Sequence, residues 1–91
     1  MNDSRDVFVG NKVFMNYVTG VVMQFNKGFG SVIIKARGKY ISKAVDIAEM
    51  VRNRFLSDVV VKDVLLGSAE FNRDDGKNIR VSTIDIVLSK Q

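Results

Sequence analysis

The chain has 91 residues, of which 46% are hydrophobic and 26% are charged, and a formal net charge of +4 at pH 7; this predicts one small domain over residues 1–91 and excludes a disordered chain. No apolar run approaches the roughly 20 residues needed to span a membrane, and the charged residues 1–6 do not fit a signal peptide, so we expect a soluble cytoplasmic protein. The absence of cysteine and histidine excludes disulfides, zinc–thiolate sites and catalysis by a histidine base.

The first half of the chain predicts a strand, a helix and a second strand. Residues 7–9 form a short apolar run of β-forming side chains. Residues 13–26 include many β-branched side chains, but their apolar residues recur at helical spacing, and we give the period more weight than the propensity. We expect Asn11 to cap this helix and Gly28 to end it. Residues 31–37 are typical of a strand that is largely buried on both faces.

The second half predicts a helix followed by two long strands. Apolar residues between Ile41 and Phe55 form a stripe at helical spacing, and Ser42 lies where it could start the helix. Residues 59–71 are rich in β-forming side chains, and residues 79–88 alternate apolar with polar side chains. The polar segment between them contains an Asp-Gly turn signal, so these two strands should form an antiparallel hairpin.

The order β-α-β-α-β-β defines the predicted fold. A right-handed crossover joins the first two strands, and both helices then pack on the same sheet. We expect an α/β two-layer sandwich in which two helices cover a four-stranded mixed sheet. The hairpin formed by the last two strands is too long for so small a body to cover, so it should project with Arg73, Lys77 and Arg80 near its tip.

None of the candidate catalytic patterns predicts an enzyme. Asp74 and Asp75 are adjacent acids beside a turn glycine, where forming the turn is their commoner role. The Gly-Phe-Gly segment at residues 28–30 follows a helix rather than a strand, which does not match a dinucleotide-binding fingerprint. The serines have no histidine to activate them. We expect no catalytic residue, no metal site, no cofactor and no small-molecule substrate.

The positive charge is concentrated in the first half of the chain. Residues 7–45 contain six basic side chains and no acidic one, whereas residues 46–91 contain seven basic and eight acidic side chains. Lys35, Arg37 and Lys39 lie at the end of the second strand, and Lys12 follows the first. Because parallel strands share their carboxyl edge, these cations should meet at one end of the domain, where they could contact phosphates. A merely solvated loop is the alternative.

Several segments, in their order and spacing, resemble the archaeal Alba family of chromatin proteins. They are GNKVFMNYV at residues 10–18, IKARGK at 34–39, ISKAVD at 41–46, VRNRF at 51–55, GS at 67–68 and RVSTI at 80–84. The resemblance covers essentially residues 6–90. It implies a homodimer in the nucleoid that coats and compacts double-stranded DNA with little sequence preference and also binds RNA.

The resemblance also implies roles for individual residues. The surface that meets the phosphate backbone is matched by Lys12, Asn16, Tyr17, Arg37 and Lys39, and the arms that reach toward the minor groove by Arg73, Lys77 and Arg80. The interface between neighbouring dimers is matched by Arg52, Asn53, Arg54 and Phe55. The helical stripe alone would instead assign Phe55 to the core. Asn11 stands where many members have a lysine linked to acetylation, so the resemblance does not carry that regulation over.

Two alternatives remain open at this point. RNA could be the main partner, with the protein acting as an RNA chaperone or a ribonucleoprotein subunit, because projecting hairpins and a broad basic face also suit RNA. The chain could instead be a protein-interaction module whose helices form an assembly interface and whose basicity is incidental. Salt-dependent binding to nucleic acid separates this second alternative from the other readings.

Overall fold

In a computed structural model, which describes residues 4–91, the elements follow the predicted β-α-β-α-β-β order. A 3-10 turn precedes the second helix, and a π-helical turn extends it. The elements are β1 (Ser4–Phe8), α1 (Phe14–Asn26), β2 (Ser31–Arg37), η1 (Gly38–Tyr40), α2 (Ile41–Met50), η2 (Val51–Phe55), β3 (Val59–Asn72) and β4 (Asn78–Lys90). Residues 1–3, part of the charged start that we judged unlike a signal peptide, lie outside the described residues.

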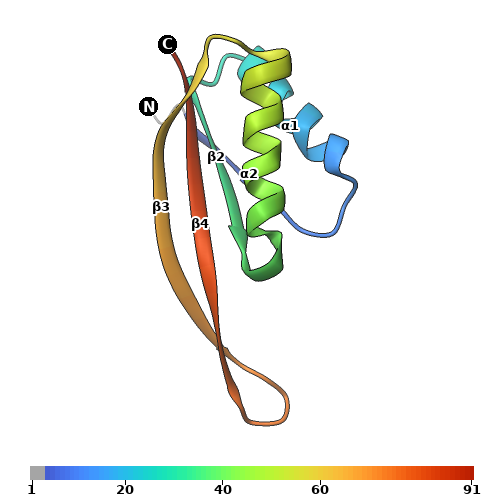
Figure 1. The fold of residues 1–91 in the computed structure, drawn as a ribbon, viewed down its shortest axis with the longest axis vertical. Coiled ribbons are helices and arrows are strands. Elements are labelled where there is room, and N and C mark those ends of the chain that lie inside the picture. The colour runs from blue at the N-terminus through green and yellow to red at the C-terminus, as the bar shows by residue number, and fades with distance from the viewer. Residues whose placement is uncertain (1–3) are drawn as a thin grey trace.

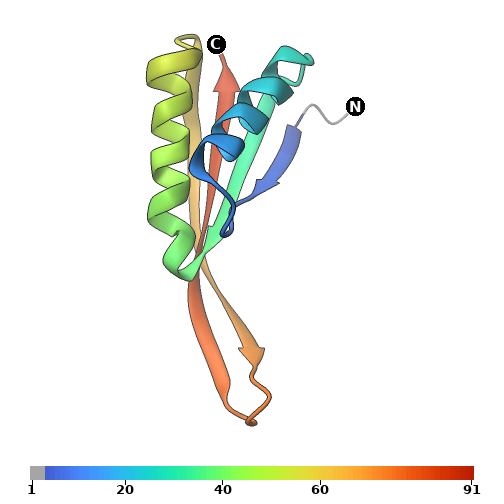
Figure 2. The ribbon, with the colours of Figure 1, turned by 90° about the vertical axis from the view of Figure 1, so that its right-hand side faces the viewer.

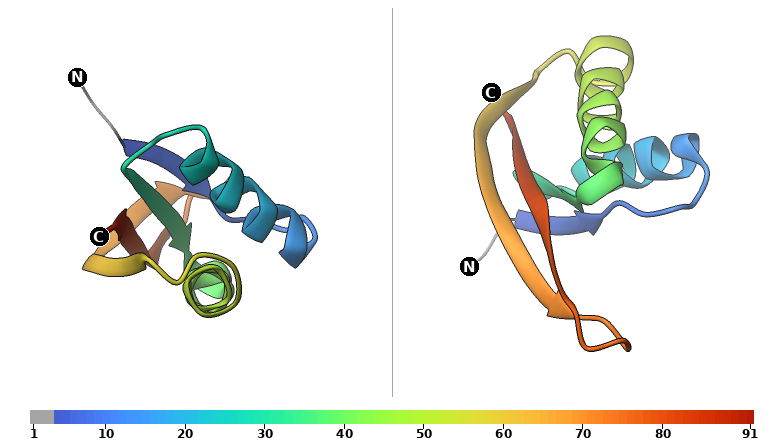
Figure 3. Two further views of the ribbon diagram at one scale, coloured as in Figure 1. Left: turned by 90° about the horizontal axis from the view of Figure 1, so that it is seen from above. Right: turned by 60° about the horizontal axis from the view of Figure 1, so that its bottom comes forward.

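A single mixed sheet supports both helices. Its strand order is β1-β2-β4-β3, with β1 and β2 parallel and the other neighbours antiparallel. Both helices lie on one face of the sheet (Figure 1 and Figure 2), which confirms the two-layer α/β sandwich. Seen from above, α2 is viewed end-on and α1 is inclined to it (Figure 3). Strands β3 and β4 run past the helices as a projecting hairpin, and the longest extent of the described residues is 46 Å.

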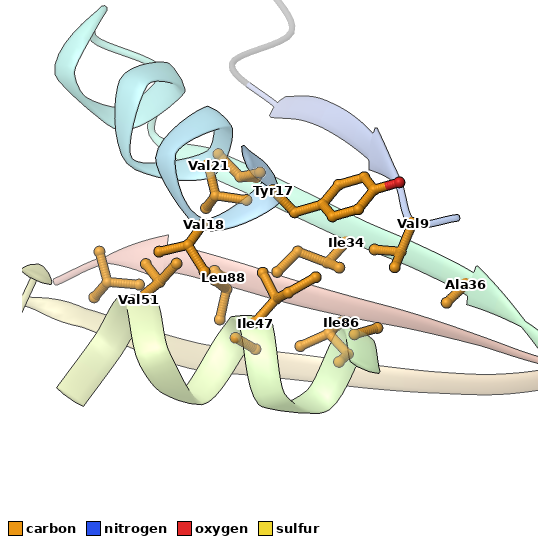
Figure 4. Packing of buried hydrophobic residues seen from close by; sticks show 14 of the residues in the cluster. Val9, Tyr17, Val18, Val21, Ile34, Ala36, Ile47, Val51, Ile86 and Leu88 are labelled. Carbon is orange, nitrogen blue, oxygen red and sulfur yellow. The ribbon is translucent and has the colours of Figure 1, made fainter. Parts of the chain in front are cut away.

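The core lies between the helices and the covered face of the sheet (Figure 4). On β2 the buried residues Val32, Ile34 and Ala36 alternate with partly exposed ones. Our expectation that this strand is buried on both faces is therefore wrong. The helices cover only one face, so the opposite face of β2 keeps Lys35 and Arg37 in contact with solvent.

Helix α1 confirms that the apolar period outweighs the β-branched composition. Tyr17, Val18, Val21 and Phe25 are buried on its inner face. Asn11 does not cap the helix, because the cap position is Val13 and no side chain hydrogen bonds there. Gly28 does end the helix: its φ is 103°, a left-handed conformation that glycine adopts without strain, and its N–H donates to the Phe25 carbonyl over 3.0 Å.

Helix α2 buries Ala44, Ile47 and Ala48, and the π-helical turn η2 continues from it with Val51 in the core. No side chain caps the start of α2, so Ser42 does not have the role that we expected. Phe55, at the end of η2, is 50% exposed and is not a core residue. Neither helix of the described residues 4–91 is long and apolar enough to cross a membrane.

Strand β3 contains a β-bulge near its start. Val61 lies opposite Leu88, and Asp63 lies opposite Val87. Lys62 is therefore the extra residue of the bulge. Beyond the bulge, Val64 and Leu66 lie opposite the core residues Ile86 and Ile84 and therefore face the helix side of the sheet. The predicted hairpin is confirmed, and its turn has Gly76 at a φ of 82°.

Candidate nucleic-acid interface

The loops after β1 and β2 meet at one end of the domain, as the parallel pairing of these strands requires. Lys12 lies in the loop after β1, Arg37 ends β2 and Lys39 lies in η1, and all three are exposed. Lys43, in the first turn of α2, ties this helix to the loop after β1, because its Nζ donates to the carbonyl oxygens of Gly10 and Lys12. We call Lys12, Arg37, Lys39 and Lys43 the carboxyl-edge cluster.

Tyr17 lies beneath this cluster rather than on its surface. The residue is only 9% exposed, and its hydroxyl accepts hydrogen bonds from the N–H groups of Gly10 at 2.9 Å and Lys12 at 3.2 Å. Figure 4 shows the hydroxyl pointing toward the chain beside Val9, just after β1. The Tyr17 hydroxyl therefore supports the Lys12 loop, while its expected contact with phosphate stays a prediction. Asn16, one residue earlier on α1, is exposed.

Lys35 differs from the carboxyl-edge cluster although it lies on the same strand as Arg37. Its Nζ is 3.5 Å from Asp85 and 3.9 Å from Asp6, on the two strands that flank β2. Two carboxylates thus offset its charge, and it is a weaker candidate for phosphate contact than the sequence indicated. Arg37 has no carboxylate neighbour of this kind among residues 4–91, and its guanidinium lies 5.5 Å from the centre of the Phe71 ring.

The projecting hairpin carries as many acids as bases. Residues 70–80 contain three of each, so their net charge is zero. Arg80 donates from Nη2 and Nε to Glu70 over 2.7 and 3.1 Å, and Arg73 lies 3.9 Å from Asp75. Lys77, the third expected arm cation, is exposed beside the turn, where its backbone N–H bonds the Asp75 side chain. Exposed ion pairs of this kind contribute at most about 1 kcal/mol, so a phosphate group could replace the carboxylate partners of Arg73 and Arg80. Because its net charge is zero, the hairpin tip adds little to the long-range attraction of a polyanion.

The four residues expected at the second interface are consecutive in η2, and Arg52 donates from Nη1 to the Asn53 side chain over 3.1 Å. Arg52 lines a groove between α2 and β3 with Val61 and Val64, and its Nε lies 3.3 Å from Glu49 without hydrogen-bond alignment. Asn53 and Arg54 line a different hollow, beside Phe14 and Asp46 of the two helices. Phe55 is half-exposed at the end of η2.

Sequence reasoning missed Lys43 and did not single it out as a functional residue. Its Nζ lies 5.0 Å from the centre of the Tyr17 ring and 5.9 Å from that of Tyr40. The available signal was its membership of the acid-free residues 7–45, although Asp46 follows only three residues later. Its partners lie 31 and 33 residues away in the chain, which no local pattern indicates.

The comparisons with known proteins agree with this architecture. The family model described as Alba matches residues 5–68. A protein named DNA/RNA-binding protein Alba from Methanothrix thermoacetophila is 57% identical over 90 residues, which cover 99% of this chain and 100% of the relative. DNA/RNA-binding protein Alba 1 from Archaeoglobus fulgidus is 53% identical over 87 residues, which cover 96% and 97%. The solved structure of Alba from Thermoplasma volcanium is 45% identical, with a TM-score of 0.90 over 94% of this chain and 100% of that one.

Proposed function

The chain belongs to the Alba family, and from this premise we propose that it is a nucleic-acid-binding protein and not an enzyme. We infer that it binds double-stranded DNA through phosphate contacts with little sequence preference, that it also binds RNA, and that it associates with the chromosome. The names of its relatives, DNA/RNA-binding proteins, support the partner class. The choice of phosphates rather than bases is supported by the residue types, because lysine and arginine on loops suit backbone contacts that carry no sequence information.

The observation that carries this proposal is the unneutralised charge of the carboxyl-edge cluster. Among residues 4–91, no salt bridge involves Lys12, Arg37 or Lys39, whereas the structure pairs Lys35 and Arg80 with carboxylates. Three exposed cations at one end of a small domain form a local positive potential that attracts a polyanion. Each cation that contacts a phosphate of duplex DNA makes the slope of log binding constant against log salt concentration more negative by about 0.9.

We further propose that the protein acts as a homodimer through the groove between α2 and β3. Val45, Val61 and Val64 line this groove, with exposed fractions of 41%, 38% and 46%, and it has a volume of about 210 Å³. Leu66, on the same side of β3, is 79% exposed. Contiguous apolar surface of this kind favours association, and a chain this short gains stability from it. Further contacts between dimers along DNA would use the half-exposed Phe55.

A titration of fluorescent duplex DNA at several salt concentrations tests the proposal, with two unrelated sequences and an RNA hairpin of similar length. A dimer offers about six cluster cations in Lys12, Arg37 and Lys39, so we expect a log–log salt slope of about −5 that is equal for both duplexes. A clear preference for the hairpin at one salt concentration would make RNA the main partner. Salt-insensitive or absent binding at about 50 mM salt would refute the proposal and favour a protein-interaction module.

A further inference from the structure

The loop that carries Lys12 has little backbone structure of its own. Residues 9–13 belong to no helix or strand, and the backbone hydrogen bonds of this loop are at its ends, from Val9 to the Lys35 carbonyl and from Asn16 to the Val13 carbonyl. The polar backbone groups between these ends need other partners to keep one conformation. The position of the Lys12 side chain therefore depends on what binds the middle of the loop.

Two side chains, one from each helix, bind the backbone of the same two loop residues. One binds their N–H groups and the other binds their carbonyl groups. The Tyr17 hydroxyl of α1 accepts the N–H groups of Gly10 and Lys12. The Lys43 ammonium of α2 donates to the carbonyl oxygens of these residues, over 2.8 and 2.5 Å. Both the donor and the acceptor of Gly10 and of Lys12 are thus bound, and the ammonium also lies 5.0 Å from the centre of the Tyr17 ring.

Lys43 has little capacity left for a phosphate. An ammonium has three N–H donors, and two of them are used on loop carbonyls. The residue is half-buried, with its Nζ near the rings of Tyr17 and Tyr40, whereas Lys12 and Lys39 are exposed. Its geometry is that of a structural cation at the junction of two helices and a loop.

We propose that Lys43 is a positioning residue for nucleic-acid binding: it holds the Lys12 loop so that the Lys12 ammonium lies beside Arg37 and Lys39. This inference rests on the proposed function, because it concerns how the same surface is prepared for phosphates. The competing role is a direct phosphate contact by Lys43, in the manner of the other cluster cations. The two roles differ in whether the effect of Lys43 depends on the presence of Lys12.

A double-mutant cycle in DNA binding separates the two roles. Lys43→Met keeps an unbranched apolar stem but cannot donate a hydrogen bond, and Lys12→Ala removes the positioned ammonium. If Lys43 acts through Lys12, each single variant and the double variant should flatten the salt slope by the same amount, about 1.8 per dimer. If Lys43 contacts phosphate itself, the double variant should lose about 3.6 per dimer, and that result would overturn the proposal. Lys27→Met, which removes an exposed charge at the far end of α1, is the matched control.

A second measurement tests the loop contact in the protein without nucleic acid. Hydrogen exchange of the Gly10 and Lys12 amides should accelerate in Lys43→Met, while the amide of the core residue Val21 should keep its wild-type rate. Lys43→Arg, which can still donate to both carbonyls, should restore slow exchange. Unchanged exchange of the loop amides in Lys43→Met would overturn the proposal. If the wild type bound no DNA, the proposed function would fail, and this exchange measurement would still decide whether Lys43 holds the loop.

Discussion

Removing the Tyr17 hydroxyl is the sharpest test of how the Lys12 loop is built. Tyr17→Phe keeps the ring in the core but takes the acceptor away from two backbone N–H groups, those of Gly10 and Lys12. A hydrogen bond of this type contributes about 1 kcal/mol net, and water can replace part of it at a half-buried site, so we expect a loss of about 1–2 kcal/mol in the free energy of unfolding. For a domain of this size, that lowers the Tm by roughly 4–16 °C.

Thermal unfolding followed by circular dichroism measures this loss at a fixed protein concentration. Tyr40→Phe is the matched control, because the Tyr40 hydroxyl makes no hydrogen bond among residues 4–91 although its ring also lies beside Lys43. The control should unfold within about 2–4 °C of the wild type, because such surface substitutions change the free energy of unfolding by at most about 0.5 kcal/mol. Equal Tm values for the two variants would refute the reasoning and show that water serves the loop amides as well as Tyr17 does.

Three further predictions concern the other surfaces. Arg37→Ala should weaken binding equally on unrelated duplex sequences and flatten the salt slope by about 1.8 per dimer; in the same anisotropy titration, a loss confined to one sequence would contradict a phosphate contact. Phe55→Ala should change the Tm little, because the side chain is 50% exposed, but should reduce cooperative coating in gel-shift titrations, and undiminished cooperativity would count against the dimer–dimer role. Val64→Asp places a charge in the α2–β3 groove and should give a monomer in sedimentation velocity. Leu65→Asp, on the opposite face of β3, is the control and should leave the dimer intact. A dimer that survives Val64→Asp would refute this interface.

The fold could be predicted because its periodicities are local. Short segments of sequence contain these patterns, and each predicted the correct element. A helical spacing relates Tyr17, Val18 and Val21, and a two-residue alternation relates Ile84, Ile86 and Leu88. The hairpin followed in the same way from its turn residues. Element order and handedness then left one economical arrangement for the two helices and the mixed sheet.

The candidate site was harder because its partners come from distant strands and helices. Lys35 was expected to point at phosphates, but the register of the sheet places it between Asp6 and Asp85, and a single sequence does not show the register. Lys43 was overlooked for the same reason, since its carbonyl partners lie on a loop more than 30 residues earlier. Charge counting located the acid-free part of the chain but could not separate the cations that have carboxylate neighbours from those that do not.

The β-bulge at Lys62 marks a position where β3 can lose a residue without exchanging its two faces. Beyond the bulge, Val64 and Leu66 face the helix side of the sheet, while Asp63 and Leu65 face away. Loss of the Lys62 codon would remove the bulge but leave Asp63 and Val64 on their present faces, because Val61 and Asp63 would then follow each other in regular alternation. In a strand without a bulge, the loss of one residue would move every later side chain to the other face of the sheet. A gene that lost this codon would therefore still encode the same apolar face of β3 beyond the bulge.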